Sequence, residues 1–329
     1  MHSDKKSSRP RRRKNRALRT FKYTFISLLM VFAAVLGIFS AVRYTRPYNI
    51  ESAKYFDEDT FEEVEISEEK CNILIMGTDK EGLRTDVIML AQINPLDDKV
   101  TVMSIPRDTW VNYRGSNMKI TEVHAIGYNR AGSGASKTEK SAKGSEATII
   151  AVRELTGVPI NYHIKVNFAA FRMAVDELGG VDFDVPQRMV YSDPYQDLYI
   201  DLAPGMQHLD GDKAEQLVRF RQYINGDLDR IKVQQDFLHE LVAQKLKAKY
   251  IGKVGDIYSI IVENMETLMS PNNFVQCGQQ VLGIGGENIK TVTLPVSFVE
   301  GKPYVKPKTG EISALIEEEF GYDSEGNDI

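Results

Sequence analysis

Residues 71–105 read CNILIMGTDKEGLRTDVIMLAQINPLDDKVTVMSI. This stretch holds three apolar runs, CNILIMG (71–77), VIMLAQI (87–93) and VTVMSI (100–105), and a turn with Asn-Pro and charged residues precedes the third. Apolar residues at consecutive positions, as in VIML, are typical of a strand that is covered on both faces. The stretch therefore predicts neighbouring strands of a buried sheet.

Helical and strand patterns alternate along the rest of the chain. Helical patterns are found at 145–157, 167–180, 210–220, 227–249, 255–269 and 270–283, and strand patterns at 161–166, 181–185 and 289–295. Ser145 and Asn167 are placed to cap the first two helices, and Gly157 to end the first. The Gly/Ser/Lys-rich segment 127–144 has no periodicity and predicts a mobile loop. We expect an α/β domain with a central mixed β-sheet flanked by helices on both faces.

The N-terminus predicts a membrane anchor. Residues 1–22 hold ten Lys or Arg against one acid, and the next twenty residues, 23–42, carry no charge. A helix of about 20 apolar residues spans a bilayer, and the basic excess places the N-terminus in the cytoplasm. A cleaved signal peptide is the alternative, but its apolar core usually has only about 7–15 residues. Either way, the remainder would lie outside the cytoplasm.

We therefore expect a single-pass protein of the cell membrane with five parts. These are a basic cytoplasmic tail (1–22), a transmembrane helix (23–42), an acidic stalk (43–70), an extracytoplasmic catalytic domain (71–322) and a C-terminal tail (323–329). The chain nets −5, and because the basic tail contributes +9, the remainder carries −14. A basic tail of this kind sets topology and contacts anionic lipids, so we expect no nucleic-acid partner.

Two cysteines, Cys71 and Cys277, are too few for a disulfide framework. They could pair, or both could be buried thiols. The chain has no GxSxG, GxxxxGK[ST] or HExxH motif, and no GxGxxG after a strand.

Acids and arginines instead lie near the ends of the predicted strands. Asp79 follows the first strand, Arg84 and Asp86 precede the second, and Arg107 follows the third. Each alone is more often a turn or cap residue. Together they bring two carboxylates and two arginines to the edges of neighbouring strands, and two carboxylates with water and substrate oxygens suit Mg²⁺.

A second polar group lies in VRFRQYINGDLDRIKVQQ (218–235). On a helix that begins near residue 227, Arg230 and Gln234 share a stripe with Leu238 and Leu241, so they should face the core. A buried arginine needs an anionic partner. Internal salt bridges to Asp86, Asp227 or Asp229 are one explanation. The other is a bound diphosphate, held by Arg84, Arg107, Arg219, Arg221 and Arg230.

The ordered motifs NILIMGTD, RTDVIML, VTVMSIPRDTWV, MKITEVHAIG, ELTGVPINYHIKVNFAAFRMAVDELGGVDFDV, LDGDKAEQLVRFR and GDLDRIKVQQ resemble the LytR–CpsA–Psr family over about residues 71–250. The resemblance implies a membrane-anchored extracytoplasmic enzyme. It would transfer an anionic glycopolymer, a teichoic acid or a capsular polysaccharide, from a polyprenyl-pyrophosphate carrier onto peptidoglycan, with Mg²⁺ at the diphosphate.

The resemblance also implies roles for individual residues. Asp79 and Asp86 would bind the metal, and the diphosphate would be bound by Arg84, Arg107, Arg219, Arg221, Arg230 and Gln234. Asp86, Arg107, Arg219 and Arg221 would be catalytic, with Asp86 or Asp79 accepting the proton of the attacking hydroxyl. The family often has arginine directly before the Gln-Gln pair, where this chain has Val233, and the spacing from Asp79 to Asp86 is short for the family.

Two other functions fit the same residues. A polyprenyl-diphosphate hydrolase would bind the diphosphate in the same way with water as the attacking group, and a non-catalytic envelope module would bind without turnover. For the lipid tail of the carrier we expect a hydrophobic pocket in the α/β core beside the arginines.

Overall fold

The computed structural model describes residues 70–79, 81–194, 198–223, 227–245, 265–284, 288–323 and 326–329. All of them belong to one compact unit, residues 50–329. The predicted basic tail, transmembrane helix and acidic stalk, apart from Lys70, lie outside the described residues. Among the helices that are described, none has both the length and the apolar character needed to cross a bilayer.

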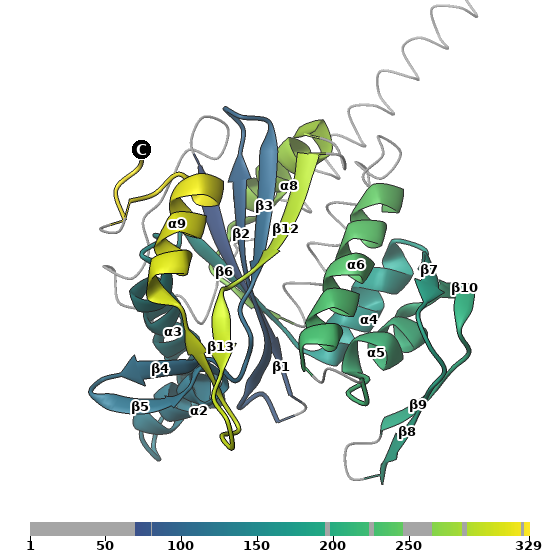
Figure 1. Ribbon diagram of the computed structural model, residues 1–329, viewed down its shortest axis with the longest axis horizontal. Coiled ribbons are helices and arrows are strands. Elements are labelled where there is room, and N and C mark those ends of the chain that lie inside the picture. The colour runs from purple at the N-terminus through teal and green to yellow at the C-terminus, as the bar shows by residue number, and fades with distance from the viewer. Residues whose placement is uncertain are drawn as a thin grey trace, which may run out of the picture. The chain divides into compact units, whose positions relative to one another are not determined.

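The centre of the unit is a mixed sheet whose described strands run in the order β11-β6-β1-β2-β3-β12 (Figure 1). Their bounds are β1 Cys71–Thr78, β2 Thr85–Asn94, β3 Lys99–Ser104, β6 Tyr162–Val166, β11 Met265–Thr267 and β12 Ile289–Thr293. β1, β2 and β3 pair antiparallel, while β6 is parallel to β1 and β12 is parallel to β3. The three apolar runs of residues 71–105 are therefore adjacent strands, as predicted.

Helices cover both faces of this sheet (Figure 1), which confirms the expected fold class. Side chains alternate along β1, so that Leu74 and Met76 face one core and Ile73 faces the other. The first core is closed by α2 (Ile120–Arg130), α3 (Lys137–Thr156) and α9 (Thr309–Phe320). The second is closed mainly by α8 (Pro271–Ile284). Both faces of β2 are buried, which explains why its sequence is apolar at consecutive positions rather than at alternating ones.

A third core lies beside the sheet. The part of the chain that forms it also contains the candidate residues Arg219, Arg221, Arg230 and Gln234. Its helices are α4 (Phe168–Glu177), α5 (Gly211–Arg219) and α6 (Asp227–Lys245). They pack against two antiparallel pairs of strands, β7 (Val181–Val185) with β10 (Gly205–Leu209) and β8 (Met189–Asp193) with β9 (Leu198–Leu202). In Figure 1 this group lies on the opposite side of the sheet from α2, α3 and α9.

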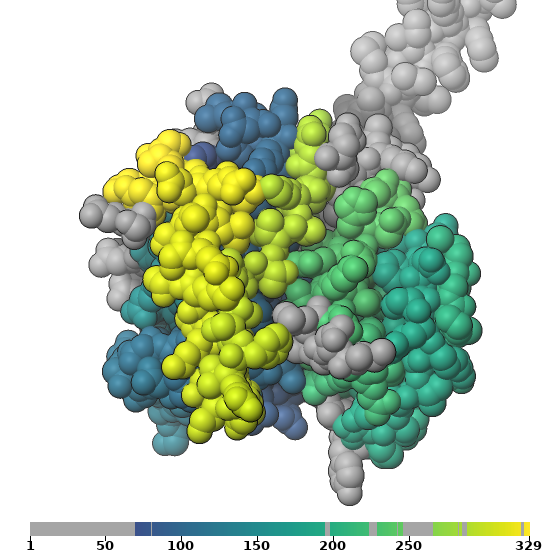
Figure 2. All heavy atoms as spheres, in the orientation of Figure 1, coloured from purple at the N-terminus to yellow at the C-terminus, as the bar shows by residue number. Residues whose placement is uncertain are grey.

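The remaining described strands form two small antiparallel pairs. These are β4 (Trp110–Tyr113) with β5 (Ser116–Lys119), and β13 (Val296–Phe298) with β14 (Val305–Pro307). Figure 2 shows the yellow atoms of the C-terminal segment, which includes α9, spread over the side of the unit that faces the viewer.

Three sequence-based expectations are wrong. The segment 127–144 is not a loop throughout, because α2 continues to Arg130 and α3 begins at Lys137. The N-cap of α3 is consequently Ser136, whose side chain accepts a hydrogen bond from the amide of Glu139, and not Ser145. The end of the helix expected at 255–269 is the strand β11, and most of that segment lies outside the described residues.

The physical reason for the longer α3 is tertiary packing. The first turns of the helix are poor in large apolar residues, but Ala142 and Gly144 are buried, so that small side chains let the helix lie close to its neighbour. Other local predictions are confirmed: Asn167 caps α4 through a hydrogen bond from Ala170, and Gly157 ends α3.

Candidate functional site

Asp86 lies at a β-bulge between β1 and β2. Gly77 is opposite Val87 and Thr78 is opposite Thr85, so Asp86 is the extra residue on β2. A bulge redirects the side chain that it carries and is common beside functional sites. The close strand approach also favours the glycine, because a Cβ at position 77 would lie 3.0 Å from the Cβ of Val87.

The Asp86 carboxylate binds two of the predicted arginines at once. Arg107 donates from Nη1 to Oδ1 at 2.6 Å, and Arg221 donates from Nη2 to Oδ2 at 3.1 Å. The Asp86 side chain is 16% exposed and that of Arg221 is 47% exposed. The three residues therefore meet at the end of a central strand, where solvent can reach Arg221, and we call them the Asp86 clamp.

Two further charged residues continue the clamp, and the sequence analysis missed both. Arg107 Nε lies 3.9 Å from an oxygen of Asp108, and Lys119 donates to the other oxygen of Asp108 at 2.8 Å. Lys119 ends β5. Charged residues inside the motifs SIPRDTW and MKITEVHAIG were the signal that could have pointed to Asp108 and Lys119.

Arg219 lies at the end of α5 and is held by a carboxylate of its own. It donates to Glu215, one helical turn earlier, at 2.6 Å, and Glu215 also accepts a hydrogen bond from Arg172 of α4. The guanidinium of Arg219 lies 4.5 Å from the ring centroid of Phe168. Glu215 is buried. The sequence analysis missed Glu215 and Arg172, although the i, i+4 spacing of Glu215 and Arg219 is a readable signal for the first.

The buried stripe predicted on α6 is confirmed. Arg230 and Gln234 are 4% and 8% exposed, and Leu238 and Leu241 pack against the two cores that α6 adjoins. Gln234 donates to the carbonyl of Val218 at 3.0 Å. Because this carbonyl belongs to the last turn of α5, Gln234 fixes the helix end from which Arg219 and Arg221 follow.

Tyr223 lies close to Arg230, between α5 and α6. Burial raises the pKa of Tyr223 to about 12, the charge of Arg230 opposes this shift, and that of Asp229 adds to it. Its ring packs edge-on against Phe220 at 5.1 Å between centroids. Tyr223 is therefore a neutral phenol at physiological pH.

The structure does not join Asp79 and Arg84 to the clamp by any direct contact within its described residues. Asp79 Oδ1 accepts hydrogen bonds from the backbone amides of Leu83, at 2.9 Å, and Arg84, at 3.3 Å. This is the turn-forming role that an aspartate most often has at such a position. Arg84 is exposed.

A divalent cation would find hard oxygen ligands here but no cage of protein ligands. Within the described ranges no three His, Cys, Asp or Glu side chains are grouped so that they could hold a metal ion. Asp79 and Asp86 flank the same β1–β2 connection, and Asp79 Oδ2 has no hydrogen-bond partner among the described residues. The two carboxylates fit Mg²⁺, which takes its other ligands from water and phosphate, if Asp86 exchanges one of its arginine partners for the cation.

The cysteines, which the sequence left either paired or free, are both buried thiols on the α8 side of the sheet. Burial beside Cys277 raises the pKa of the Cys71 thiol, with the hydrogen bond between the two side chains as the largest contribution. The expected hydrophobic pocket for a lipid tail stays a prediction.

Comparisons with known proteins give the family. The model of the LytR_cpsA_psr family matches residues 40–320. A teichoic acid transferase, "polyisoprenyl-teichoic acid–peptidoglycan teichoic acid transferase TagU" of Bacillus cereus, is 31% identical over 218 residues, which are 64% of each chain. The chain thus spans about 64% of the length of this curated relative.

Solved structures share the fold. The crystal structure of B. subtilis TagV has a TM-score of 0.62 at 25% identity, covering 76% of this chain and 97% of that chain. A structure of TagT bound to LI-WTA has a TM-score of 0.59 at 22% identity, covering 78% of this chain and 92% of that chain. Since the family model matches most of its length, this chain belongs to the LytR–CpsA–Psr family.

Proposed function

We propose that this protein transfers an anionic glycopolymer, a teichoic acid or a capsular polysaccharide, from a polyprenyl-pyrophosphate carrier to peptidoglycan. Family membership and the transferase TagU among its relatives support the proposal. The observation that carries it is the Asp86 clamp, which gathers Arg107 and Arg221 at one partly exposed carboxylate. Two further cations are also paired with carboxylates, Lys119 with Asp108 and Arg219 with Glu215.

The clamp explains how a diphosphate would be bound. Guanidinium groups present paired N–H donors that match phosphate oxygens. Arg107 and Arg221 already have a carboxylate partner, so their positions are set before a substrate arrives. A preorganised donor costs little reorganisation when charge develops in the transition state. Each charged hydrogen bond would contribute roughly 1.5–3 kcal/mol.

The proposed step is a phosphoryl transfer. The C6 hydroxyl of an N-acetylmuramic acid residue attacks the phosphorus that is linked to the polymer. A new oxygen–phosphorus bond forms, the bond to the bridging oxygen of the diphosphate breaks, and polyprenyl phosphate leaves with that oxygen. The arginines stabilise the charge on the transferred phosphoryl oxygens and on the leaving group.

The hydroxyl proton needs an acceptor, and two carboxylates are candidates. Both Asp86 oxygens accept hydrogen bonds from arginines, so Asp86 would have to release one of them to accept the proton. Asp79 is fixed through Oδ1 by the turn that it caps. Replacing each with asparagine separately, and comparing the pH profiles of transfer, would distinguish the two.

Mg²⁺ is part of the proposal. Asp79 and Asp86 would hold it, and when bound it would supply positive charge beside the diphosphate oxygens. The proposed transmembrane helix at 23–42, with the N-terminus in the cytoplasm, would keep the catalytic domain outside the cell membrane and near the lipid carrier.

The test is transfer by the purified full chain in detergent, with a synthetic lipid-diphosphate sugar as donor and peptidoglycan oligomers as acceptor, with and without Mg²⁺. The expected result is a phosphodiester-linked product that requires the acceptor and is lost on adding a chelator. Release of polyprenyl phosphate without an acceptor would show a hydrolase instead. Binding without turnover would show a non-catalytic module.

A further inference from the structure

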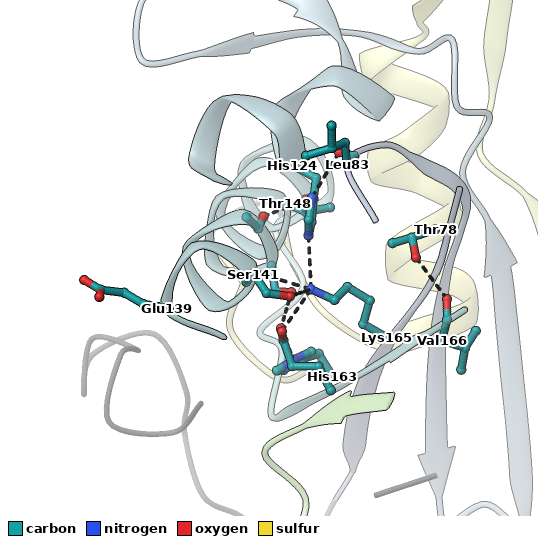
Figure 3. A network of polar contacts seen from close by, with 12 residues as sticks. Thr78, Leu83, His124, Glu139, Ser141, Thr148, His163, Lys165 and Val166 are labelled. Atoms are coloured by element: carbon teal, nitrogen blue, oxygen red, sulfur yellow. Dashed lines mark hydrogen bonds and ion pairs between the residues drawn. The ribbon is translucent and has the colours of Figure 1, made fainter. Parts of the chain in front are cut away.

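A buried polar network joins β6, α2 and α3 (Figure 3). Its centre is Lys165 on β6, which is 7% exposed. The Lys165 ammonium donates to Ser141 Oγ at 2.6 Å and to Glu266 Oε2 at 2.9 Å, and it lies 3.2 Å from Nε2 of His124. His124 and His163 are completely buried. No part of the proposed phosphoryl transfer uses these residues.

The contacts determine which nitrogen of His124 carries the proton. An ammonium group can only donate, so Nε2 must accept from Lys165, and the proton is therefore on Nδ1. Nδ1 lies 3.1 Å from the carbonyl of Leu83, which can only accept. Both contacts of the ring are satisfied by this one neutral tautomer. His124 thus accepts on one side and donates on the other.

The charge state agrees with that geometry. Burial and the charge of Lys165 together lower the pKa of His124 to about 3, against the opposing charge of Glu266. Burial works to raise the pKa of Glu266, but Lys165 and His163 outweigh this and hold it below its ordinary range. The Glu266 carboxylate is therefore ionised, and it compensates the buried ammonium beside His124.

The partner of His124 is the loop that carries Arg84. Within residues 79 and 81–84, the hydrogen bonds close a self-contained turn, in which Asp79 accepts from Gly82, Leu83 and Arg84 and donates to the carbonyl of Arg84. Among the described residues, the bond from His124 to Leu83 is the one that joins this turn to the rest of the protein. Because the clamp residue Asp86 comes two residues after Arg84, the position of the turn matters at the site.

We propose that His124 is a positioning residue, which holds the Asp79–Arg84 turn, and with it the guanidinium of Arg84, at the diphosphate site. Lys165, Ser141 and Glu266 fix its ring and tautomer. The role of Arg84 rests on the proposed function, whereas the anchoring of the turn does not.

Hydrogen exchange of the full chain tests the anchoring without any assay of activity. Asn at position 124 places its amide nitrogen near the site of Nδ1 and keeps the bond to Leu83, whereas Gln places it near Nε2 and Leu keeps neither. In His124→Leu and His124→Gln, amide exchange in the peptide 78–88 should rise about tenfold, since loss of one hydrogen bond is worth about that factor. His124→Asn should exchange as the wild type does.

The control is His208→Asn, because His208 is an exposed histidine that binds Asp182 far from the turn. It should leave exchange in the peptide 78–88 unchanged. Unchanged exchange in His124→Leu, or a rise spread evenly over the whole chain, would overturn the anchoring. If His124→Leu does not fold, the contrast between the Gln and Asn variants decides the question.

The second arm asks whether the turn acts through Arg84. His124→Leu should raise the KM for the lipid-diphosphate donor about tenfold with little change in kcat, and His124→Asn should restore it. The double variant His124→Leu/Arg84→Ala should have the same KM for the donor as Arg84→Ala alone. Additive increases in KM would contradict the proposal. If the wild type shows no transfer, the proposed function fails and the exchange arm still decides the anchoring.

Discussion

At the scale of single residues, the Asp86 clamp depends on hydrogen bonds between charged groups. Each oxygen of the Asp86 carboxylate accepts a hydrogen bond from a positively charged guanidinium. Arg107 and Arg221 provide these two groups from opposite halves of the chain. Arg107 also lies near Asp108, so its guanidinium has two carboxylate neighbours. A single ammonium cannot reproduce such a fork of donors.

We therefore predict that Arg107→Lys lowers transfer about 100-fold or more, close to Arg107→Ala, while the fold is retained. The measurement is steady-state transfer together with the melting temperature of each variant. Arg188→Ala is the matched control, since Arg188 is 52% exposed and binds Asp201 on the β8–β9 pair. Wild-type turnover in Arg107→Lys would mean that charge alone suffices at this position.

Glu215 holds Arg172 and Arg219 together, and its charge should matter more than its shape. Glu215→Gln keeps the volume but removes the buried negative charge that Arg172 and Arg219 share, so we predict a loss of about 1–3 kcal/mol in the free energy of unfolding and weaker donor binding. Urea unfolding and the donor KM measure the two effects. Asp212→Asn is the control, because Asp212 also contacts Arg172 but is 83% exposed; an equal loss there would argue against a special role of the buried carboxylate.

At the scale of elements, α6 connects the central sheet to the third core. The amide nitrogen of Gln235 lies within hydrogen-bonding distance of three oxygens, Ser104 Oγ at 3.0 Å, the carbonyl of Val292 at 2.9 Å and Thr293 Oγ1 at 3.1 Å, which share its two N–H donors. These acceptors lie at the ends of β3 and β12. One turn of α6 thus fixes the helix to the sheet through Gln235 and to α5 through Gln234.

We predict that Gln235→Ala lowers the free energy of unfolding by about 1–3 kcal/mol, because polar groups at the ends of two strands lose their donor. Lys232→Ala, an exposed change on the same helix, should stay within about 0.5 kcal/mol of the wild type. Urea unfolding of both variants checks this. Equal stability of the two would mean that the contacts of Gln235 are replaced by water at no cost.

At the scale of the whole molecule, two buried histidines make stability depend on pH. Burial lowers the pKa of both His124 and His163. Lys165 lowers both further, and Glu266 opposes it. Below about pH 6.5 the unfolded chain therefore binds more protons at these positions than the folded protein does. Stability is therefore highest above pH 6.5 and falls as the pH decreases.

We predict a decline of about 1.4 kcal/mol per pH unit for each histidine once the pH is well below 6.5. Urea unfolding of the full chain between pH 4.5 and 7.5 measures it, a window chosen to lie at and above the ordinary pKa of Glu266. His124→Asn should remove about half of the slope. A flat profile for the wild type would show that the histidines are protonated in the folded protein or titrate normally.

Much of the fold and part of the site could be predicted from local patterns. Unbroken apolar runs in residues 71–105 identify strands buried on two faces, and the stripe of Arg230 with Gln234 identifies the buried side of α6, because both depend only on the periodicity of an element. The start of α3 could not be predicted in this way, since tertiary packing stabilises a helical segment of low intrinsic preference.

The sequence by itself determined the family motifs, the three neighbouring strands within residues 71–105 and the arginines that could bind an anion. Only the tertiary structure decided that Arg107 and Arg221 share Asp86, that Glu215 also holds Arg172, and that His124 meets Lys165. Such pairings join residues far apart in the chain. Their geometry follows from how the layers pack, which no local periodicity records.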